Sequence, residues 1–158
     1  PGLRIGWIAA TEEIVRRCWG TRDYISLAPA RLSDALADVA LKLRDQIVAR
    51  NHEIVAANLA AADRWFAEHA DLVSWTRPHA GLLALMRYHL DVPSLDLSNK
   101  LAADYSVMLA PGSAFGFEGH LRIGIGQTQR IFEEGLNRTA ACLQQLQREE
   151  VARRAVAV

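Results

Sequence analysis

Two arginines with nearly the same neighbours are the residues of this sequence best suited to bind a ligand. Arg4 lies in the run GLRIGW, and Arg122 lies in the run HLRIGIG. Each stands among apolar residues and glycines, where an unpaired buried charge costs about 3–5 kcal/mol. A guanidinium binds a phosphate or a carboxylate through two parallel hydrogen bonds. The two sites therefore indicate a ligand with two anionic groups, or else internal salt bridges to Asp or Glu.

Three other candidates for chemistry are weaker. Lys100 could form a Schiff base, but it belongs to a polar helical pattern, which favours a solvated surface lysine. Ser113 lies in PGSAF without the G-x-S-x-G elbow of a nucleophile, so we expect a turn. Gly124 and Gly126 form half of a dinucleotide fingerprint, but Gln129 stands where the third glycine belongs. None of these is assigned a catalytic role.

Composition narrows the class of protein. The chain has 158 residues, 51% of them hydrophobic, which is enough for one ordinary domain with a core. Lys plus Arg equals Asp plus Glu at 18 each, so charge gives no argument for nucleic acid or for an anionic membrane. Cys18 and Cys142 are far apart and no H-E-x-x-H motif occurs, so we expect no metal site and a reduced, cytoplasmic setting. No apolar run approaches the roughly 18 residues of a membrane span.

The elements around Arg4 follow from the first hydrophobic run. Leu3–Ala10 is almost continuously apolar, which is typical of a strand buried on both faces of a sheet. Such a strand needs neighbours, and the next strand candidate begins near Leu72, so we expect the chain to be the C-terminal piece of something longer. Thr11, followed by two acidic residues, predicts a helix to about Trp19, ended by Gly20.

The elements predicted around Arg122 follow from a change in the spacing of apolar residues along the chain. Apolar residues spaced by three and four predict one long helix over 29–70. The polar stretch 50–53 interrupts the apolar stripe and is either a kink or a solvent-facing turn. After Asp71, alternation and turn residues predict short strands. We expect strands at 72–76, 81–88, 107–109 and 120–125, a helix at 98–105 between the second and third, and a terminal helix at 127–154.

Four motifs in order then resemble one family. The segment PGLRIGW around Arg4 is similar to the one that follows the cofactor lysine in the fold type I aminotransferases of class I and II. PHAGLL at 78–83 resembles that family's strand with its proline and glycine. PGSAFG at 111–116 resembles the loop before the last strand, and HLRIG at 120–124 resembles the final arginine strand. Order and spacing agree over nearly the whole chain.

The resemblance implies a fold and a division into domains. The fold class is α+β, with a long helix leading into a small, mainly antiparallel sheet covered by helices. The last strand of the large domain precedes this helix. Residues 1–28 would be the end of the large cofactor-binding domain, and residues 29–158 would be the C-terminal small domain.

The resemblance also implies site residues. The cofactor would be pyridoxal 5'-phosphate, whose phosphate Arg4 would bind, and Arg122 would bind the α-carboxylate of the amino-acid substrate. The enzyme would move an amino group between an amino acid and a 2-oxo acid. The family's Schiff-base lysine is expected upstream of Pro1, so no catalytic residue is assigned within this chain and the chain alone is expected to be inactive. Its partners would be the remainder of the same enzyme and a second copy in a homodimer, with no nucleic acid and no membrane.

Two alternatives remain open at this point. The same fold carries out β-elimination, replacement or cyclisation on amino acids in secondary metabolism, and both arginines would serve those reactions equally well. A third hypothesis makes the chain a non-catalytic regulatory or dimerisation domain.

Overall fold

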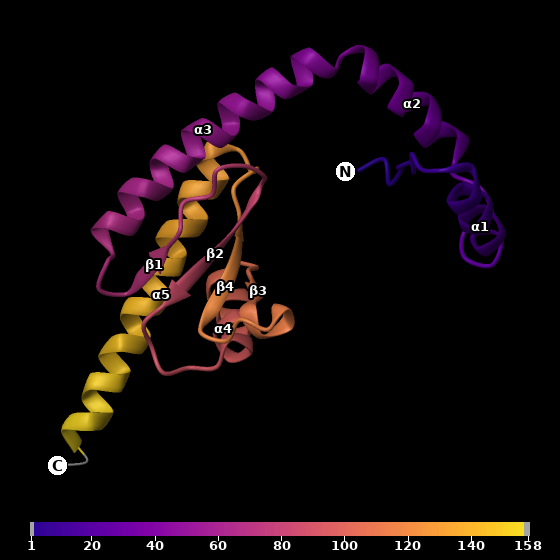
Figure 1. Cartoon of the computed structure of the whole chain (residues 1–158). Helices are drawn as coiled ribbons and strands as arrows, with labels where there is room; N and C mark the ends of the chain where they lie inside the picture. Colours follow the sequence, from indigo (N-terminus) through magenta and orange to yellow (C-terminus); the bar gives the residue numbers. More distant parts are fainter. Residues whose placement is uncertain (1, 157–158) are drawn as a thin grey trace. The chain divides into compact units, whose positions relative to one another are not determined.

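The computed structural model describes residues 2–156, and it divides into two compact units, Pro1–Arg50 and Asn51–Val158. Figure 1 labels the elements in chain order. They are α1 (Glu12–Arg22), α2 (Arg31–Lys42), α3 (Arg44–Glu68), β1 (Val73–Trp75), β2 (Leu83–Tyr88), α4 (Ser94–Tyr105), β3 (Ala110–Pro111), the short 3-10 helix η1 (Gly112–Phe115), β4 (His120–Gly124) and α5 (Gln129–Val156). The predicted α+β class, with a small antiparallel sheet and helices, is confirmed. Within the described residues no helix is both long and apolar enough to cross a membrane.

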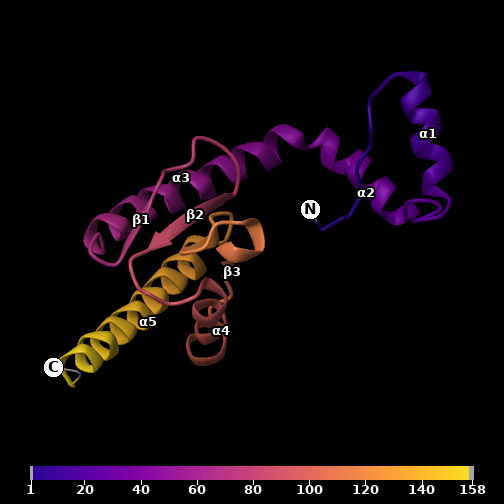
Figure 2. The same cartoon turned by 60° about the horizontal axis from the view of Figure 1, so that its bottom comes forward.

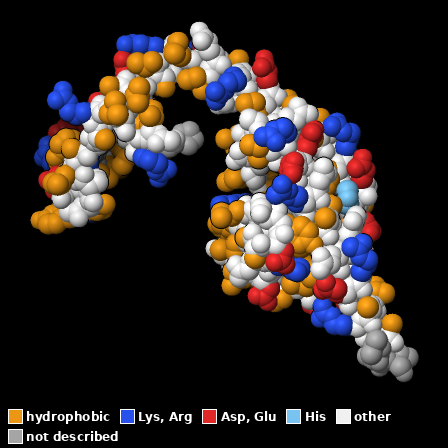
Figure 3. Space-filling model, turned by 180° about the vertical axis from the view of Figure 1, so that it is seen from behind, with side chains coloured by type: hydrophobic (Ala, Val, Ile, Leu, Met, Phe, Trp, Pro, Cys, Tyr) orange, Lys and Arg blue, Asp and Glu red, His pale blue; other side chains and the backbone are white. Residues whose placement is uncertain are grey.

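The strand expected at Leu3–Ala10 is not formed. Residues 4–10 have no regular secondary structure, and the side chains of Trp7 and Ile8 are 70% and 65% exposed. A strand satisfies its backbone groups through a neighbouring strand, and no described residue pairs with this segment. Figure 3 shows many hydrophobic side chains on the molecular surface. In the first unit, α1 and α2 also expose large hydrophobic side chains. The apolar composition of the segment was therefore not sufficient to predict its conformation.

The helix that follows is longer than predicted. It begins after Thr11, whose backbone is extended and whose side chain makes no capping hydrogen bond, and it carries Glu12 and Glu13 in its first turn. It does not end at Gly20 but continues to Arg22. A helical glycine costs about 1 kcal/mol relative to alanine, which is too little to end a helix alone.

The single helix predicted over 29–70 is two helices. Leu43 separates α2 from α3, with φ −100° and ψ 14°, outside the helical region. The stretch 50–53, for which a kink and a solvent-facing turn were the two alternatives, lies inside the continuous helix α3. Leucine is a strong helix former, so residue propensity gives no signal for a break at this position.

The sheet has the order β1-β2-β4-β3, and every pair is antiparallel. The longest pairing joins β2 to β4, from Leu83↔Gly124 to Arg87↔His120. The strands predicted at 72–76, 81–88 and 120–125 are found as β1, β2 and β4. The strand predicted at 107–109 is wrong, because β3 lies at Ala110–Pro111. Ser106 ends α4 in the left-handed conformation, with φ 55°, and the chain needs residues 107–109 to reach the edge of β4.

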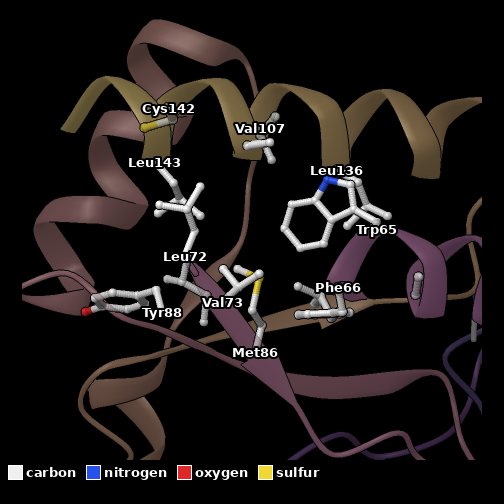
Figure 4. Close-up of a cluster of buried hydrophobic side chains, with 14 of the residues drawn as sticks. Trp65, Phe66, Leu72, Val73, Met86, Tyr88, Val107, Leu136, Cys142 and Leu143 are labelled. Atoms are coloured by element: carbon white, nitrogen blue, oxygen red, sulfur yellow. The ribbon is translucent and has the colours of Figure 1, made fainter. Parts of the chain in front are cut away.

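The core lies between one face of this sheet and helices. In the second unit, residues of α3 and α5 pack on the same side of the sheet, as Figures 1 and 2 both show, and α4 contacts β3 and α5. Figure 4 shows Trp65, Phe66 and Met86 within this cluster. The ring of Phe66 stacks on Trp75 at 4.5 Å and meets Trp65 edge-on at 5.0 Å. Met86 is completely buried.

A buried amide ties α3 to the segment after β4. Asn58 is completely buried, and its Nδ2 donates to the carbonyl oxygens of Ile125, at 3.0 Å, and Gln127, at 2.7 Å. Its Oδ1 has no hydrogen-bond partner. The two hydrogen bonds satisfy backbone carbonyl groups in the segment between β4 and α5, where the chain has left the sheet.

The β3–β4 connection contains a glycine that no other residue can replace without movement of the backbone. A Cβ built on Gly112 would lie 2.0 Å from the carbonyl oxygen of Phe117 and 2.6 Å from that of His120. The same approach lets the N–H of Phe117 donate to the carbonyl of Gly112 at 2.9 Å. The connection therefore folds tightly back on itself between β3 and β4.

A carboxylate fixes the far end of this connection. Oε1 of Glu118 accepts hydrogen bonds from the backbone N–H of Ser94, at 2.6 Å, and of Gly119, at 3.1 Å. These bonds lower the pKa of Glu118, because they stabilise the charged form. Burial, followed by the negative charge of Glu118, raises the pKa of Tyr88 to about 12, and its hydroxyl donates to the carbonyl of Val92 at 2.6 Å. Glu118 thus joins the start of α4 to the turn before β4.

We expect Gly112→Ala to destabilise the chain by about 1–3 kcal/mol, because the new Cβ must displace two backbone carbonyls. Gly135→Ala is the matched control, since a Cβ there meets nothing within 4 Å and alanine is the better helix former. Urea unfolding of both variants measures the difference. Equal midpoints for the two variants would contradict the close packing around Gly112.

We expect the stabilisation from the Glu118 charge to depend on pH. Because the pKa of Glu118 is lowered in the folded chain, this stabilisation is complete above its ordinary value of 4.5 and is lost as the pH falls through the lowered value. The wild type should therefore exceed Glu118→Gln in free energy of unfolding near neutral pH, and the gap should close in acid. Glu133→Gln is the control, because Glu133 accepts one hydrogen bond, from Gln129 of its own helix. A gap for Glu118→Gln that stays constant with pH would count against this account.

Candidate functional site

Arg122 projects from the face of the sheet that the helices leave open. Its neighbours Leu121 and Ile123 are 0% and 2% exposed and point into the core. Because side chains alternate along a strand, Arg122 points to the opposite face, where it is partly buried. On the adjacent strand, its register partner is Leu85. β4 thus places Arg122 on a mixed face of the sheet, which carries Leu85 and, by the same alternation, Arg87 and His120.

The guanidinium of Arg122 is held by an aromatic ring and not by an acid. Its Cζ lies 4.4 Å from the centroid of the Phe115 ring. Among the described residues, no Asp or Glu forms an ion pair with Arg122, so the alternative of an internal salt bridge finds no support there. A ring face attracts a cation through its quadrupole and uses none of the hydrogen-bond donors of the guanidinium. Those donors remain available to an anionic ligand.

Arg4 lies in the first unit, in different surroundings. It is exposed, contrary to the expectation of a buried strand residue, and its backbone is left-handed, with φ 50°. It lines a hollow of about 960 Å³ within this unit. The wall also contains Trp7, Trp19, Arg17 and Arg22. No described acid forms an ion pair with Arg4.

The donor set of this hollow suits a phosphate. Three arginines and one acid, Asp34, line it, so its wall carries a positive excess. Arginine matches the oxygens of a phosphate bidentately, and the indole rings of Trp7 and Trp19 add apolar surface for a ring-bearing ligand. Arg4 and Arg122 belong to different units, so the structure describes each anchor in its own unit.

The weaker candidates behave as the sequence predicts. Nζ of Lys100 forms an ion pair with Asp104 at 2.8 Å, four residues on in α4. The hydrogen bond to Asp104 is the main cause that raises the pKa of Lys100, so this amine stays charged near neutral pH. Ser113 lies in η1, where its backbone N–H donates to Oγ of Ser94 at 3.1 Å. Neither residue has the surroundings of a nucleophile.

A second hollow, of about 570 Å³, lies beside α5 in the second unit. Its wall includes Met86, Ile123 and Leu136, with Arg130 and Arg138 also lining it. Arg122 is not part of this wall. The hollow is therefore separate from the open face on which the predicted carboxylate anchor lies.

Sequence reasoning missed the residues that hold Arg122 in place. Phe115 was visible in the motif PGSAFG, but a ring separated by seven positions from an arginine gives no signal of contact. The loop must turn back, through Gly112 and the turn at Gly116, with φ 77°, before the two side chains meet. Glu118, between Phe117 and Gly119, likewise gives no signal in the sequence of its contact with the start of α4.

Comparison with known proteins supports the resemblance. The family model for aminotransferase class I and II matches residues 1–138. Capreomycidine synthase of Streptomyces vinaceus is 28% identical over 136 residues, which are 86% of this chain and 35% of that protein. A probable aminotransferase of Arabidopsis thaliana is 25% identical over 151 residues, covering 87% of this chain and 34% of that one.

Solved structures agree on the fold. A PLP-dependent aminotransferase from Streptococcus suis superposes with a TM-score of 0.85 at 32% identity, over 92% of this chain and 39% of that chain. The PLP-dependent cyclase OrfR superposes with a TM-score of 0.83 at 29% identity, over 92% of this chain and 40% of that one. The chain spans about a third of the length of the curated relatives it matches. Because the family model matches residues 1–138, most of its length, the chain belongs to the aminotransferase class I and II family.

Proposed function

We propose that this chain is the C-terminal part of a pyridoxal-phosphate-dependent aminotransferase that moves an amino group between an amino acid and a 2-oxo acid. The observation that carries the proposal is the guanidinium of Arg122, partly buried on the open face of β4 and without an acid partner among the described residues. A partly buried guanidinium whose hydrogen-bond donors are unused by an acid is well placed to bind an anion. The α-carboxylate is the anion that an amino acid and a 2-oxo acid share, so one arginine can serve both substrates.

Arg122 acts by orientation. Two parallel hydrogen bonds from its guanidinium fix the plane of the substrate carboxylate, and this limits rotation about the bond to Cα. Holding Cα in one orientation supplies the positioning contribution to catalysis. The bound cofactor supplies an electron sink for the bond that breaks at Cα.

Arg4 binds the cofactor phosphate in this proposal. Its donors, with those of Arg17 and Arg22 in the same hollow, provide the charge that a phosphate dianion needs. The Schiff-base lysine is supplied by the remainder of the enzyme, upstream of Pro1. The division into the end of a large domain at 1–28 and a small domain at 29–158 is part of the same proposal. So are a homodimer as the working form and a cytoplasmic setting, the latter supported by two free cysteines, Cys18 and Cys142.

A second candidate function keeps the site and changes the reaction. The similarity to capreomycidine synthase and to the PLP-dependent cyclase OrfR favours β-elimination, replacement or cyclisation on an amino acid. Arg122 and Arg4 would serve this chemistry equally well, because its substrate also has an α-carboxylate and its cofactor the same phosphate. The two candidates therefore differ in products and not in these anchors.

We expect the complete enzyme to transfer an isotopically labelled amino group from an L-amino acid to a 2-oxo acid. The complete enzyme is loaded with pyridoxal 5'-phosphate and incubated with a panel of L-amino acids, with and without pyruvate or 2-oxoglutarate. Mass spectrometry follows the label. Label in a new amino acid, seen only when the 2-oxo acid is present, supports transamination; labelled ammonia or a cyclised product supports the second candidate. Failure to take up the cofactor or to consume any amino acid would overturn both.

We expect Arg122→Ala to lower kcat/KM for the amino acid and the 2-oxo acid alike, because both lose the same carboxylate contact. Loss of hydrogen bonds to a charged group, about 1.5–3 kcal/mol, corresponds to roughly 10- to 150-fold. Arg122→Lys keeps the charge but lacks the planar guanidinium, so its kcat/KM should lie between those of the wild type and Arg122→Ala. Arg130→Ala removes an exposed arginine from the same unit and serves as control. An unchanged kcat/KM in Arg122→Ala would remove Arg122 from the site.

A further inference from the structure

We propose that Phe115 is a positioning residue that holds the guanidinium of Arg122 in the orientation needed for the substrate carboxylate. This inference rests on the proposed function of Arg122. The supporting contact is the 4.4 Å distance from Cζ of Arg122 to the centre of the Phe115 ring. It is one of two cation–ring contacts among the described residues, and the other, between Arg22 and Trp19, is longer, at 5.7 Å.

A ring suits this task better than an acid does. An arginine side chain has many rotamers, and fixing them on ligand binding costs free energy. A salt bridge within the protein would restrict the rotamers but would occupy the donors and offset the charge that the substrate carboxylate must find. The face of Phe115 restricts the guanidinium through its quadrupole and leaves the N–H groups unused.

The ring is itself held by the strand that carries Arg122. β3 pairs with β4 at Ala110↔Arg122, and η1 begins two residues later. Gly112 packs against the backbone of residues 117 and 120, and the N–H of Ser113 is fixed by Ser94 of α4. The loop thus leaves β3, places Phe115 over Arg122 and returns to β4 through the turn anchored by Glu118.

Burial shows that Phe115 does not serve the hydrophobic core. Its side chain is 43% exposed, and it is not part of the buried cluster between sheet and helices. A half-exposed aromatic side chain contributes less to stability than a buried one. Replacing the ring should therefore disturb Arg122 more than it disturbs the fold.

Phe117 provides a matched control in the same connection. It is 52% exposed, and its ring meets the imidazole of His120 edge-on at 6.2 Å. It has no ring contact with Arg122 among the described residues. Phe115→Leu and Phe117→Leu therefore remove the same ring from neighbouring, similarly exposed positions, and only the first removes a contact to the arginine.

The test compares these variants in the complete, cofactor-loaded enzyme, with the donor amino acid that the turnover panel identifies. We expect Phe115→Leu to raise KM for that amino acid and its Kd, measured by spectral titration without 2-oxo acid, by roughly three- to tenfold, with a smaller change in kcat. Phe115→Tyr keeps the ring face and should restore both constants. Phe117→Leu should remain near the wild type. Thermal unfolding midpoints close to that of the wild type establish that every variant is folded.

A chemical readout is independent of turnover. Phenylglyoxal modifies guanidinium groups, and peptide mass spectrometry reports the rate at Arg122. Removing the ring that covers one face of the guanidinium should accelerate modification in Phe115→Leu and not in Phe117→Leu. Equal rates at Arg122 in the two variants would contradict the proposed contact.

Arg122→Ala, alone and combined with Phe115→Leu, separates this inference from the proposed function. If Arg122→Ala leaves KM unchanged, the carboxylate assignment fails, whatever Phe115 does. If Arg122→Ala raises KM but Phe115→Leu matches Phe117→Leu, the assignment stands and the positioning role is overturned. If Phe115→Leu raises KM by the same factor in the Arg122→Ala background, the ring acts independently of the arginine and the proposal is also overturned. If Phe115→Leu no longer raises KM in the Arg122→Ala background, the positioning role of Phe115 is supported.

Discussion

The antiparallel ladder between β2 and β4 is the constraint on which the rest of the second unit depends. Its register, from Leu83↔Gly124 to Arg87↔His120, places Leu121 and Ile123 in the core and Arg122 on the open face. A slip of β4 by one residue against β2 would exchange the two faces of β4 and bury the guanidinium among apolar side chains. Leu121 and Ile123 would leave the core in the same step. The packing of α3 and α5 therefore enforces the direction in which the arginine points, because the core tolerates only one register.

The second requirement is that Arg122 be held without being neutralised. The connection between β3 and β4 achieves this with a ring and two backbone anchors. At one end Gly112 allows a close approach of backbone to backbone, and at the other the carboxylate of Glu118 bonds the N–H groups of Ser94 and Gly119. Glu118 thus accepts hydrogen bonds from backbone N–H groups, one of them at the start of α4, and does not form an ion pair with Arg122. Glu118 and Arg122 therefore lie close in sequence without forming an ion pair, as the proposed role of Arg122 in binding an external anion requires.

The sequence predicted what depends on local pattern and missed what depends on distant contacts. Alternation and turn residues were sufficient to predict β2 and β4. The apolar neighbours of Arg122 predicted an anion anchor, and that role stays a prediction. Apolar composition failed at Leu3–Ala10, because a strand exists only when another strand accepts its hydrogen bonds. Propensity failed at Leu43, where a strong helix former leaves the helical region. The contact with Phe115 could not be predicted, because it depends on the path of the loop and on Gly112, whose importance lies in carbonyl groups that only the folded chain brings near.

Asn58 sets a limit on the chemical lifetime of this fold. Its side-chain nitrogen supplies both hydrogen bonds to the carbonyls of Ile125 and Gln127, inside a fully buried site. Hydrolysis of this amide to a carboxylic acid, the common ageing reaction of asparagine, would remove two donors and direct acceptor oxygens at two other acceptors. The unfavourable contact would lie where β4 passes into α5, a few residues after Arg122. Such slow ageing would weaken the attachment of α3 to the end of β4, and burial, which keeps water from the amide, protects the fold against it.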